Sequence, residues 1–403
     1  MDACNKLFSP IQMGPLTLRN RTIRSAAFEG MSNNNDVSDE LIDYHRKVAA
    51  GGIGMTTVAY ASVSKDGYSF PHQLWLRNAI KPGLTRMADA VHKEGAAISI
   101  QIGHTGNMSS KSVTGFRPIS SSTKFNLYGP TCPRRMNHDD IERVVDDFAN
   151  AVRLVKSCGY DAVEVHAGHG YLISQFLSPY TNRRNDEYGG SFENRSRFMR
   201  KVLQAVRSEA GSEMALFVKM NISDGFKGGI SLSDAQHTAK LAEQEGANAI
   251  ILSGGFVSRM PVYVMRGEIP PAIMAYSIKN ILVKSMLLLF GRTLMKPFPF
   301  TNGYFMDEAA PVLQSVSIPV VAVGGIDTLD TINNAFDRGY ELIGLARCLI
   351  EDPAFVNKIR NKAIHETKCN HCNYCVAVMY TGSMKCYLHE QNIPQYLLNH
   401  LPA

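Results

Sequence analysis

Two histidines three residues apart, followed by a tyrosine, stand directly after an apolar run that ends at Val165. They are His166, His169 and Tyr171. Imidazoles at this spacing can aim two N–H donors at one carbonyl or nitro oxygen and draw negative charge onto it. A phenol, with a reference pKa of about 10, can then protonate a neighbouring carbon. The set indicates acid–base chemistry on a conjugated substrate. The alternatives are two structural histidines and a rim aromatic that packs on the ligand.

Further polar residues stand at the ends of other apolar runs. The amide of Gln101 donates and accepts hydrogen bonds, and Lys219 carries a positive charge. Lys219 could instead form an ion pair with Glu164 inside a barrel, or serve as the Schiff-base lysine of a lyase. His104 either lines the pocket or bonds a loop carbonyl.

Residues at the ends of the last two apolar runs indicate an anion site. They are Gly324, Gly325, Ala346 and Arg347, and Gly254 and Gly255 end the run before them. Backbone N–H groups exposed by glycine at the start of a helix suit a phosphate, and Arg347 adds a positive charge. The alternative for the glycines is packing alone.

Four of the eight cysteines lie close together near the end of the sequence. They are Cys369, Cys372, Cys375 and Cys386. This density is typical of a metal site, either an iron–sulfur cluster or zinc, and the remaining alternative is free or redox-active thiols. The spacing alone assigns no metal.

These residues need a scaffold that brings many strand ends to one face. A unit recurs in which a helix ends at glycine and an apolar run follows. Strands are expected at Thr22–Ala26, Ile53–Val58, Ala97–Ile102, Asp161–His166, Ala215–Met220, Asn248–Leu252, Pro319–Val323 and Glu341–Leu345. Helices are expected near 39–50, 83–94, 139–157, 192–210, 233–245, 306–315 and 328–338. Eight such units predict an α/β fold, a (β/α)8 TIM barrel.

Two connections are too long to be plain loops, and both would lie on the barrel rim. Residues 103–138 are rich in Ser, Thr, Pro and Gly, and the long insertion after strand 6, about 255–305, contains a predicted helix over 276–294. We expect lids or pocket walls, with a membrane-surface or dimer helix as the alternative. The predicted domains are the barrel over 1–365 and a short Cys-rich C-terminal extension over 366–403.

Composition excludes several classes of protein. The chain has 403 residues, of which 45% are hydrophobic and 19% charged, so extensive disorder is excluded. The net charge is +6, and the charged residues are spread along the sequence without a run of one sign, which argues against a nucleic-acid partner. The apolar stretch Ile281–Phe290 is too short for an integral membrane segment, which takes ~20 residues. No signal-like segment opens the sequence, so we expect a cytoplasmic enzyme of a small-molecule substrate, with homo-oligomerisation left open.

The segment 163–195 resembles the old yellow enzyme family of FMN-dependent oxidoreductases almost throughout. It contains the run from His166 to Tyr171 discussed above. Residues 7–21 are similar to the family's lead into strand one, and 323–326 and 343–347 are similar to its phosphate-binding strands. The resemblance extends over about residues 5 to 360.

The resemblance implies FMN as cofactor and NAD(P)H as reductant in a ping-pong cycle. FMN would be bound by Ser25, Ala26, Ala27, Gln101, Lys219, Gly254, Gly255, Gly324, Gly325, Ala346 and Arg347. His166 and His169 would hold the substrate oxygen and Tyr171 would donate the proton, which makes an ene-reductase of electron-poor C=C bonds. Phe28 stands where the family often has Thr or Cys, and we expect it to narrow the substrate pocket.

The sequence leaves three further possibilities open, one for the cysteine segment and two for the reaction. The cysteine segment resembles that of the 2,4-dienoyl-CoA reductase branch, which carries a [4Fe–4S] cluster, but two of its gaps are one residue shorter here. Related enzymes run the flavin in the other direction, as dehydrogenases or demethylases of amine-type or saturated substrates. A flavin-free, phosphate-binding lyase or aldolase barrel is the alternative from a different class.

Overall fold

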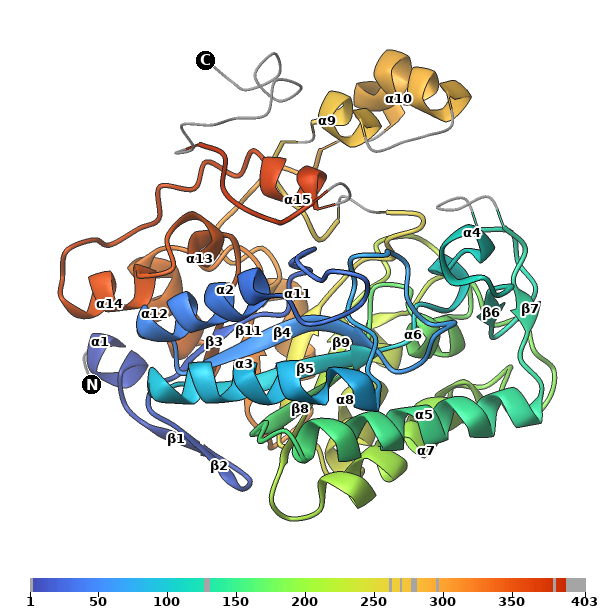
Figure 1. Cartoon of the computed structure of the whole chain (residues 1–403), viewed down its shortest axis with the longest axis horizontal. Helices are drawn as coiled ribbons and strands as arrows, with labels where there is room; N and C mark the ends of the chain where they lie inside the picture. Colours follow the sequence, from blue (N-terminus) through green and yellow to red (C-terminus); the bar gives the residue numbers. More distant parts are fainter. Residues whose placement is uncertain are drawn as a thin grey trace.

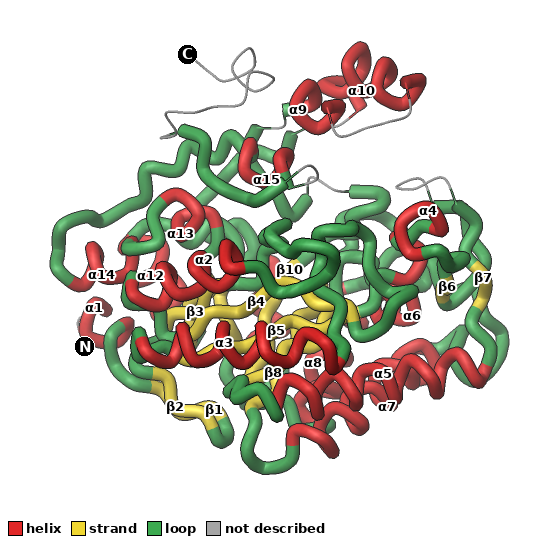
Figure 2. The backbone as a smooth tube through the Cα atoms, viewed as in Figure 1, coloured by secondary structure: helices red, strands yellow, loops and turns green. Residues whose placement is uncertain are grey.

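Eight parallel strands close into a barrel at the centre of the protein (Figures 1 and 2). The computed structural model describes residues 3–126, 131–260, 263–268, 270–276, 281–294, 297–379 and 382–388. The barrel strands are β3 (Thr22–Arg24), β4 (Met55–Ser62), β5 (Ala97–Gly103), β8 (Ala162–Ala167), β9 (Ala215–Asn221), β10 (Ala249–Ser253), β11 (Val320–Ala322) and β12 (Leu342–Leu345). The predicted (β/α)8 barrel is confirmed, and its strands are almost entirely buried because helices cover the outer face.

Seven helices lie within a few residues of the predicted segments. They are α2 (Asp39–Ala50), α3 (Lys81–Lys93), α5 (His138–Lys156), α7 (Phe192–Ala210), α8 (Leu232–Gln244), α11 (Met306–Leu313) and α12 (Leu329–Asp337). Capping boxes at Asn137 and Ser231 fix the starts of α5 and α8. After α5 and α8, Gly159 and Gly246 adopt positive φ angles of 84° and 85°, which turn the chain back toward the next strand.

A short hairpin at the start of the chain closes the N-terminal end of the barrel. It consists of β1 (Ile11–Met13) and β2 (Leu16–Leu18), and the helix α1 (Ala3–Leu7) precedes it. Met13 and Leu18 are 1% exposed and pack against interior side chains such as Phe217. This end is an apolar plug.

The C-terminal end of the barrel carries the additional elements. After β5 come η2 (Gly106–Met108), α4 (Lys111–Thr114), β6 (Ile119–Ser120) and β7 (Arg134–Arg135). After β10 come α9 (Pro271–Tyr276) and α10 (Ile281–Leu294). The single helix predicted over 276–294 is therefore wrong at its start, because Tyr276 ends α9. Residues 277–280 lie outside the described residues.

The cysteine-rich segment folds back over the same end of the barrel (Figure 1). It follows the short helices α13 (Arg347–Glu351) and α14 (Phe355–Arg360) and contains α15 (Tyr374–Val378). Cys372, Tyr374 and Val378 share an apolar cluster with Ile273 of α9. Short elements η1 (Asn78–Ile80) and α6 (Leu172–Leu177) complete the fold. In the described ranges, no helix combines the length and apolar character needed to cross a membrane.

Candidate active site

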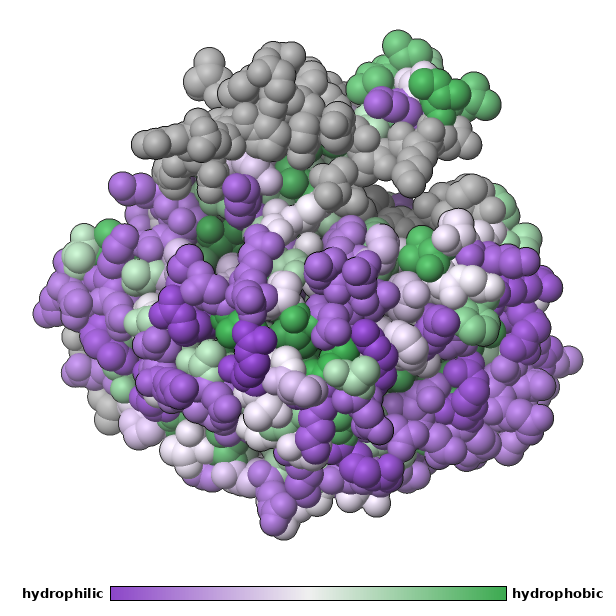
Figure 3. Space-filling view, in the orientation of Figure 1, coloured by the Kyte–Doolittle hydropathy of each residue, from purple (hydrophilic) through white to green (hydrophobic). Residues whose placement is uncertain are grey.

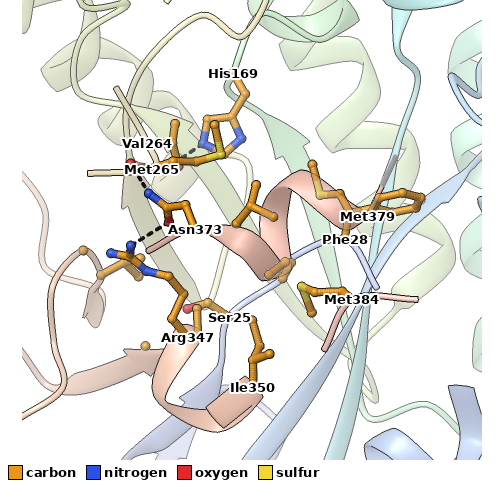
Figure 4. Close-up of a pocket in the computed structure, with 18 of the residues that line it drawn as sticks. Ser25, Phe28, His169, Val264, Met265, Arg347, Ile350, Asn373, Met379 and Met384 are labelled. Atoms are coloured by element: carbon orange, nitrogen blue, oxygen red, sulfur yellow. Dashed lines mark hydrogen bonds between the residues drawn. The ribbon is translucent and has the colours of Figure 1, made fainter. Parts of the chain in front are cut away.

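A cavity of about 250 Å³ lies at the C-terminal ends of the barrel strands (Figure 4). Residues of β4, β9, β10 and β12 and residues just after β3 and β11 form its floor and sides, and the loops after β4, β5, β8 and β10 add further walls. The predicted residues that line it are Ser25, Ala26, Ala27, Phe28, His169, Tyr171, Lys219, Gly324, Gly325, Ala346 and Arg347. One cavity thus contains most of the predicted site.

Ser25 marks the floor of the cavity where β3 ends. Its backbone N–H donates to the carbonyl of Leu345 at 2.7 Å. A Cβ on Gly344 would lie 2.6 Å from the Ser25 hydroxyl, so glycine leaves the room that this side chain occupies. The Ser25 hydroxyl is buried without a hydrogen-bond partner among the described residues. An unpaired buried hydroxyl that faces a cavity is a group that a ligand can satisfy.

Lys219 projects from β9 into the same cavity. Its Nζ lies 3.3 Å from the carbonyl oxygen of Ala26 and 3.5 Å from Oε1 of Glu164. The ion pair considered from the sequence therefore forms, and Lys219 lines the cavity as well. Gln101 donates from Nε2 to the same carboxylate at 2.6 Å and lies behind Lys219, outside the cavity lining. The carboxylate thereby holds both side chains in place.

His166 lies near the end of β8, and His169 lies in the strained turn that follows. His169 has a φ of 57°, unusual for a residue with a side chain, and its N–H donates to Oδ1 of Asn221 at 2.9 Å. Its Nε2 lies 2.8 Å from the Ser253 hydroxyl, and its ring centroid lies 5.0 Å from that of His166. Nδ1 of His166 accepts the N–H of Gly168 at 3.2 Å. A backbone N–H thus fixes the ring of His166, and the Ser253 hydroxyl fixes that of His169.

Burial makes both imidazoles neutral at physiological pH. It lowers the pKa of His169 to about 3, with the charge of Lys219 acting in the same direction. Burial also lowers the pKa of His166 well below its usual value, and His169 and Lys219 add to that shift. A neutral imidazole donates from one nitrogen and accepts at the other. The pair can therefore present two N–H donors without a positive charge. Of the two, His169 lines the cavity, and His166 lies behind it, outside the cavity lining.

Tyr171 stands at the start of α6 with its ring against that of His166. Its centroid lies 4.5 Å from that of His166 and 5.0 Å from that of Tyr60. Gln175, one turn later on α6, donates from Nε2 to the carbonyl of Gly170 at 2.6 Å and also binds Asn107 Oδ1 at 2.9 Å. This buried amide fixes the turn that carries Tyr171. Nothing in its spacing indicates that role.

Phe28 forms one wall of the cavity together with other aromatic rings. Its ring stacks on Phe70 at a centroid distance of 5.3 Å and lies 6.2 Å from Tyr60. The neighbouring Glu29 points away, where its carboxylate is 2.6 Å from Arg24 Nη1. The aromatic wall makes this part of the cavity apolar.

The opposite end of the cavity is shaped by glycine and arginine. Gly324 and Gly325 have φ angles of 101° and 72°, and a Cβ on Gly324 would lie 2.7 Å from the ring of Phe305. Arg347 donates from Nη1 to the carbonyl of Arg266 at 2.7 Å. It also donates to Oδ1 of Asn373 at 2.8 Å (Figure 4). A cation beside exposed backbone suits an anionic group.

Gly254 and Gly255 lie outside the cavity lining, because both pack against Tyr263. His104 also lies outside the cavity lining. Its Nδ1 accepts the N–H of Gly106 at 2.9 Å, and its Nε2 is 3.5 Å from Asp66. Both readings of His104 from the sequence, as a pocket residue and as a partner of a loop carbonyl, are therefore wrong.

The roof of the cavity comes partly from the insertion, which the sequence predicts as a lid or pocket wall, and partly from the cysteine-rich segment, which the sequence does not connect with the cavity. Met265 of the insertion and Met379 and Met384 of the cysteine-rich segment line the cavity. Asn373 joins these segments, since its Nδ2 donates to the carbonyls of Met265 at 2.9 Å and Glu268 at 2.7 Å. Only the folded chain brings these residues together, and no local pattern signals them.

The four C-terminal cysteines surround one small cavity next to Arg347. They are Cys369, Cys372, Cys375 and Cys386. Burial and the neighbouring thiols raise the pKa of Cys369 to about 11 and that of Cys375 to about 12. Among the described residues, no three His, Cys, Asp or Glu side chains come together as closely as a metal ion requires. The donor type suits a metal site, but the thiols are not placed as a closed ligand set.

Comparison with known proteins gives consistent similarities. A sequence model of the NADH:flavin oxidoreductase / NADH oxidase family matches residues 6–270. A 4,4'-dithiodibutanoate disulfide reductase of Rhodococcus erythropolis is 39% identical over 378 residues, which is 94% of each chain. An N,N-dimethylglycine/sarcosine dehydrogenase of Chromohalobacter salexigens is 31% identical over 94% of this chain, which spans 52% of that enzyme. The structure of a 2-naphthoyl-CoA reductase shares the fold, with a TM-score of 0.82, 24% identity, and coverage of 95% of this chain and 56% of the other.

Proposed function

The chain belongs to the NADH:flavin oxidoreductase / NADH oxidase family, and on that basis we propose that it reduces electron-poor C=C bonds with NAD(P)H and FMN. Substrates of this kind have the double bond conjugated to a carbonyl group. The observation that carries the proposal is the convergence of His169, Tyr171 and Lys219 on one apolar cavity. The flavin-free lyase is set aside by the family membership.

The cavity has the groups that FMN would need. Its aromatic and apolar walls suit a flat ring system, and the unpaired Ser25 hydroxyl offers a hydrogen bond. Lys219 at one end would stabilise negative charge on the ring, and Arg347 with the Gly324–Gly325 backbone would hold the phosphate at the other. When bound, FMN supplies the exchange of hydride with nicotinamide and substrate. These side-chain roles are part of the proposal.

His166 and His169 would orient the substrate and take up its developing charge. Because both rings are neutral, they can donate hydrogen bonds to the carbonyl oxygen, which makes the β-carbon electron-poor. The β-carbon then receives hydride, and the α-carbon receives the proton from the Tyr171 hydroxyl, which solvent restores. One NAD(P)H and one proton are consumed for each C=C bond reduced.

An anaerobic absorbance titration tests the reaction. Purified protein loaded with FMN should lose its flavin absorbance when NADPH is added and regain it when 2-cyclohexenone follows. The Tyr171→Phe variant should be bleached at the wild-type rate but recover much more slowly, because only the second half of the cycle needs the proton. Wild-type protein that bleaches and never recovers with the enone would contradict the proposal and favour the dehydrogenase direction, after which N,N-dimethylglycine should be tried.

Disulfide reduction is a second candidate function. It is favoured by the relative that is 39% identical over nearly the whole chain and is named a disulfide reductase. A disulfide takes up two electrons and two protons, so a proton donor such as Tyr171 beside the cavity serves that reaction as well. Parallel assays with 2-cyclohexenone and 4,4'-dithiodibutanoate, both with NADPH, compare the two reactions. The substrate with the higher kcat/KM identifies the preferred one.

The cysteine cavity leaves its three alternatives open in this proposal. An iron–sulfur cluster, zinc and free thiols each predict a different metal content. Protein purified without oxygen should be analysed for iron, acid-labile sulfide and zinc. The Cys375→Ser variant should lose any metal that these four residues bind, while Cys132→Ser, an exposed cysteine elsewhere, serves as the control.

A further inference from the structure

Large hydrophobic side chains exposed to solvent are concentrated at one end of the described structure. Eight of the nine belong to the two insertions that follow β5 and β10, and six of these lie on α10. They are Phe116, Phe125, Ile281, Leu282, Met286, Leu288, Leu289 and Phe290. Figure 3 shows α10 as a hydrophobic projection above a mainly hydrophilic body. An apolar patch of this kind marks a binding surface.

α10 packs on α9 along one side only. At the contact, a Cβ on Gly291 would lie 2.7 Å from the side chain of Pro271, so the two helices approach closely there. Successive helical residues are separated by about 100°, which places Leu282 and Leu289 nearly opposite Gly291. These two leucines are 78% and 75% exposed. The outward face of α10 therefore presents apolar side chains that are largely exposed.

The part of the insertion that contains α9 and α10 carries charges of one sign only, and that sign is positive. Between Glu268 and Asp307 the sequence has no acidic residue, and its basic residues are Lys279, Lys284, Arg292 and Lys296. An insertion with leucine and phenylalanine and a net positive charge matches a surface that offers acyl chains and phosphate groups. A second copy would present an insertion of the same positive charge, and like charges repel.

We propose that α9 and α10 dock this enzyme on the surface of an anionic phospholipid bilayer. α10 is about 21 Å long, shorter than the ~30 Å of bilayer hydrocarbon, so it lies in the plane of the interface with Leu282 and Leu289 among the acyl chains. The same insertion supplies Val264 and Met265 to the cavity. Docking therefore brings the cavity lining close to the lipids, from which apolar substrates can enter.

Vesicle flotation with the full FMN-loaded protein tests the proposal. Wild-type protein should float with vesicles of phosphatidylcholine and phosphatidylglycerol in low salt, and less of it should float with phosphatidylcholine alone or in high salt. The double variant Leu282→Ser with Leu289→Ser should bind the anionic vesicles at least about tenfold more weakly. Leu232→Ser, an exposed leucine on α8, should bind as wild type does. Bleaching by NADPH in all three proteins shows that they are folded.

Two results would overturn the proposal. One is equal binding of the double variant and the wild type. The other is no flotation of the wild type together with light scattering that gives the mass of two chains for the wild type and of one chain for the double variant. In that second case a second copy covers α10.

Discussion

The two ends of the barrel differ in the chemistry of the side chains that they bury. The N-terminal end is closed by the β1–β2 hairpin, whose Met13 and Leu18 pack with barrel-interior side chains into one apolar cluster. The C-terminal end holds charged and titratable groups in the open cavity, among them Lys219 and His169. The strands run parallel, so each contributes one end to the plug and one to the cavity.

Because of this difference, one end of the barrel contributes mainly to stability and the other mainly to catalysis. Burying apolar side chains is favourable, whereas burying Lys219 or an imidazole costs free energy unless partners offset that cost. Glu164 supplies such a partner from the neighbouring strand β8. We therefore expect changes at the plug to alter the free energy of unfolding and changes at the cavity to alter catalysis.

The largest effect is expected for Tyr171→Phe at the cavity end. Loss of the proton donor should lower kcat for C=C reduction by about 10²- to 10⁴-fold, as is usual for general-acid residues. The melting temperature should change little, because the ring remains. Tyr60→Phe, with its ring 5.0 Å away, is the matched control and should keep most of the activity. Equal losses in the two variants would remove Tyr171 from its proposed role.

Leu18→Ala is the corresponding change at the plug. Leu18 is 1% exposed, and a leucine removed from a packed core costs about 2–5 kcal/mol of unfolding free energy. Urea unfolding followed by circular dichroism measures this loss. The kcat/KM for the enone should stay within about twofold of wild type in conditions where the variant is folded. A large fall in kcat/KM would show that the two ends are coupled.

Two glycine substitutions compare the ends directly. Gly14 and Gly324 both have positive φ, at 56° and 101°, and both lack room for a side chain. Alanine should cost roughly 1–2 kcal/mol of backbone strain at each position. At Gly14, where the Asn248 amide blocks the space, the loss should appear in stability alone. At Gly324 it should appear mainly as weaker FMN binding, measured by fluorescence titration of the apoprotein.

The last prediction concerns the dependence of stability on pH. The pKa of His169 is about 3 in the folded protein and about 6.5 in the unfolded chain. Between these values the unfolded state binds one more proton, so stability falls as the pH is lowered through that window. The His169→Gln variant should show a shallower loss of stability between pH 7 and 4. An unchanged slope in urea-unfolding experiments would mean that His169 is not buried neutral.

The sequence predicts the barrel well because its signals are local. A glycine such as Gly159 ends a helix through its own backbone angle, whatever the rest of the chain does. Lys219 was also placed correctly, since the parallel strands fix which residues share the rim. The orientation of Gln101 toward Glu164 was not predictable, because it depends on a neighbouring strand. Asn373 and Met379 were missed for the same reason, since their partners are distant in the sequence.

The residues that form the roof of the cavity are synthesised after the barrel strands. Met379 and Met384 emerge from the ribosome after the last barrel strand, which ends at Leu345. At 5–20 residues per second, synthesis from Leu345 to Met384 takes about 2–8 s. During those seconds all eight strands exist while the last part of the cover is still being made. The part of the cavity that closes over the strand ends is therefore the last part of the described site to be synthesised.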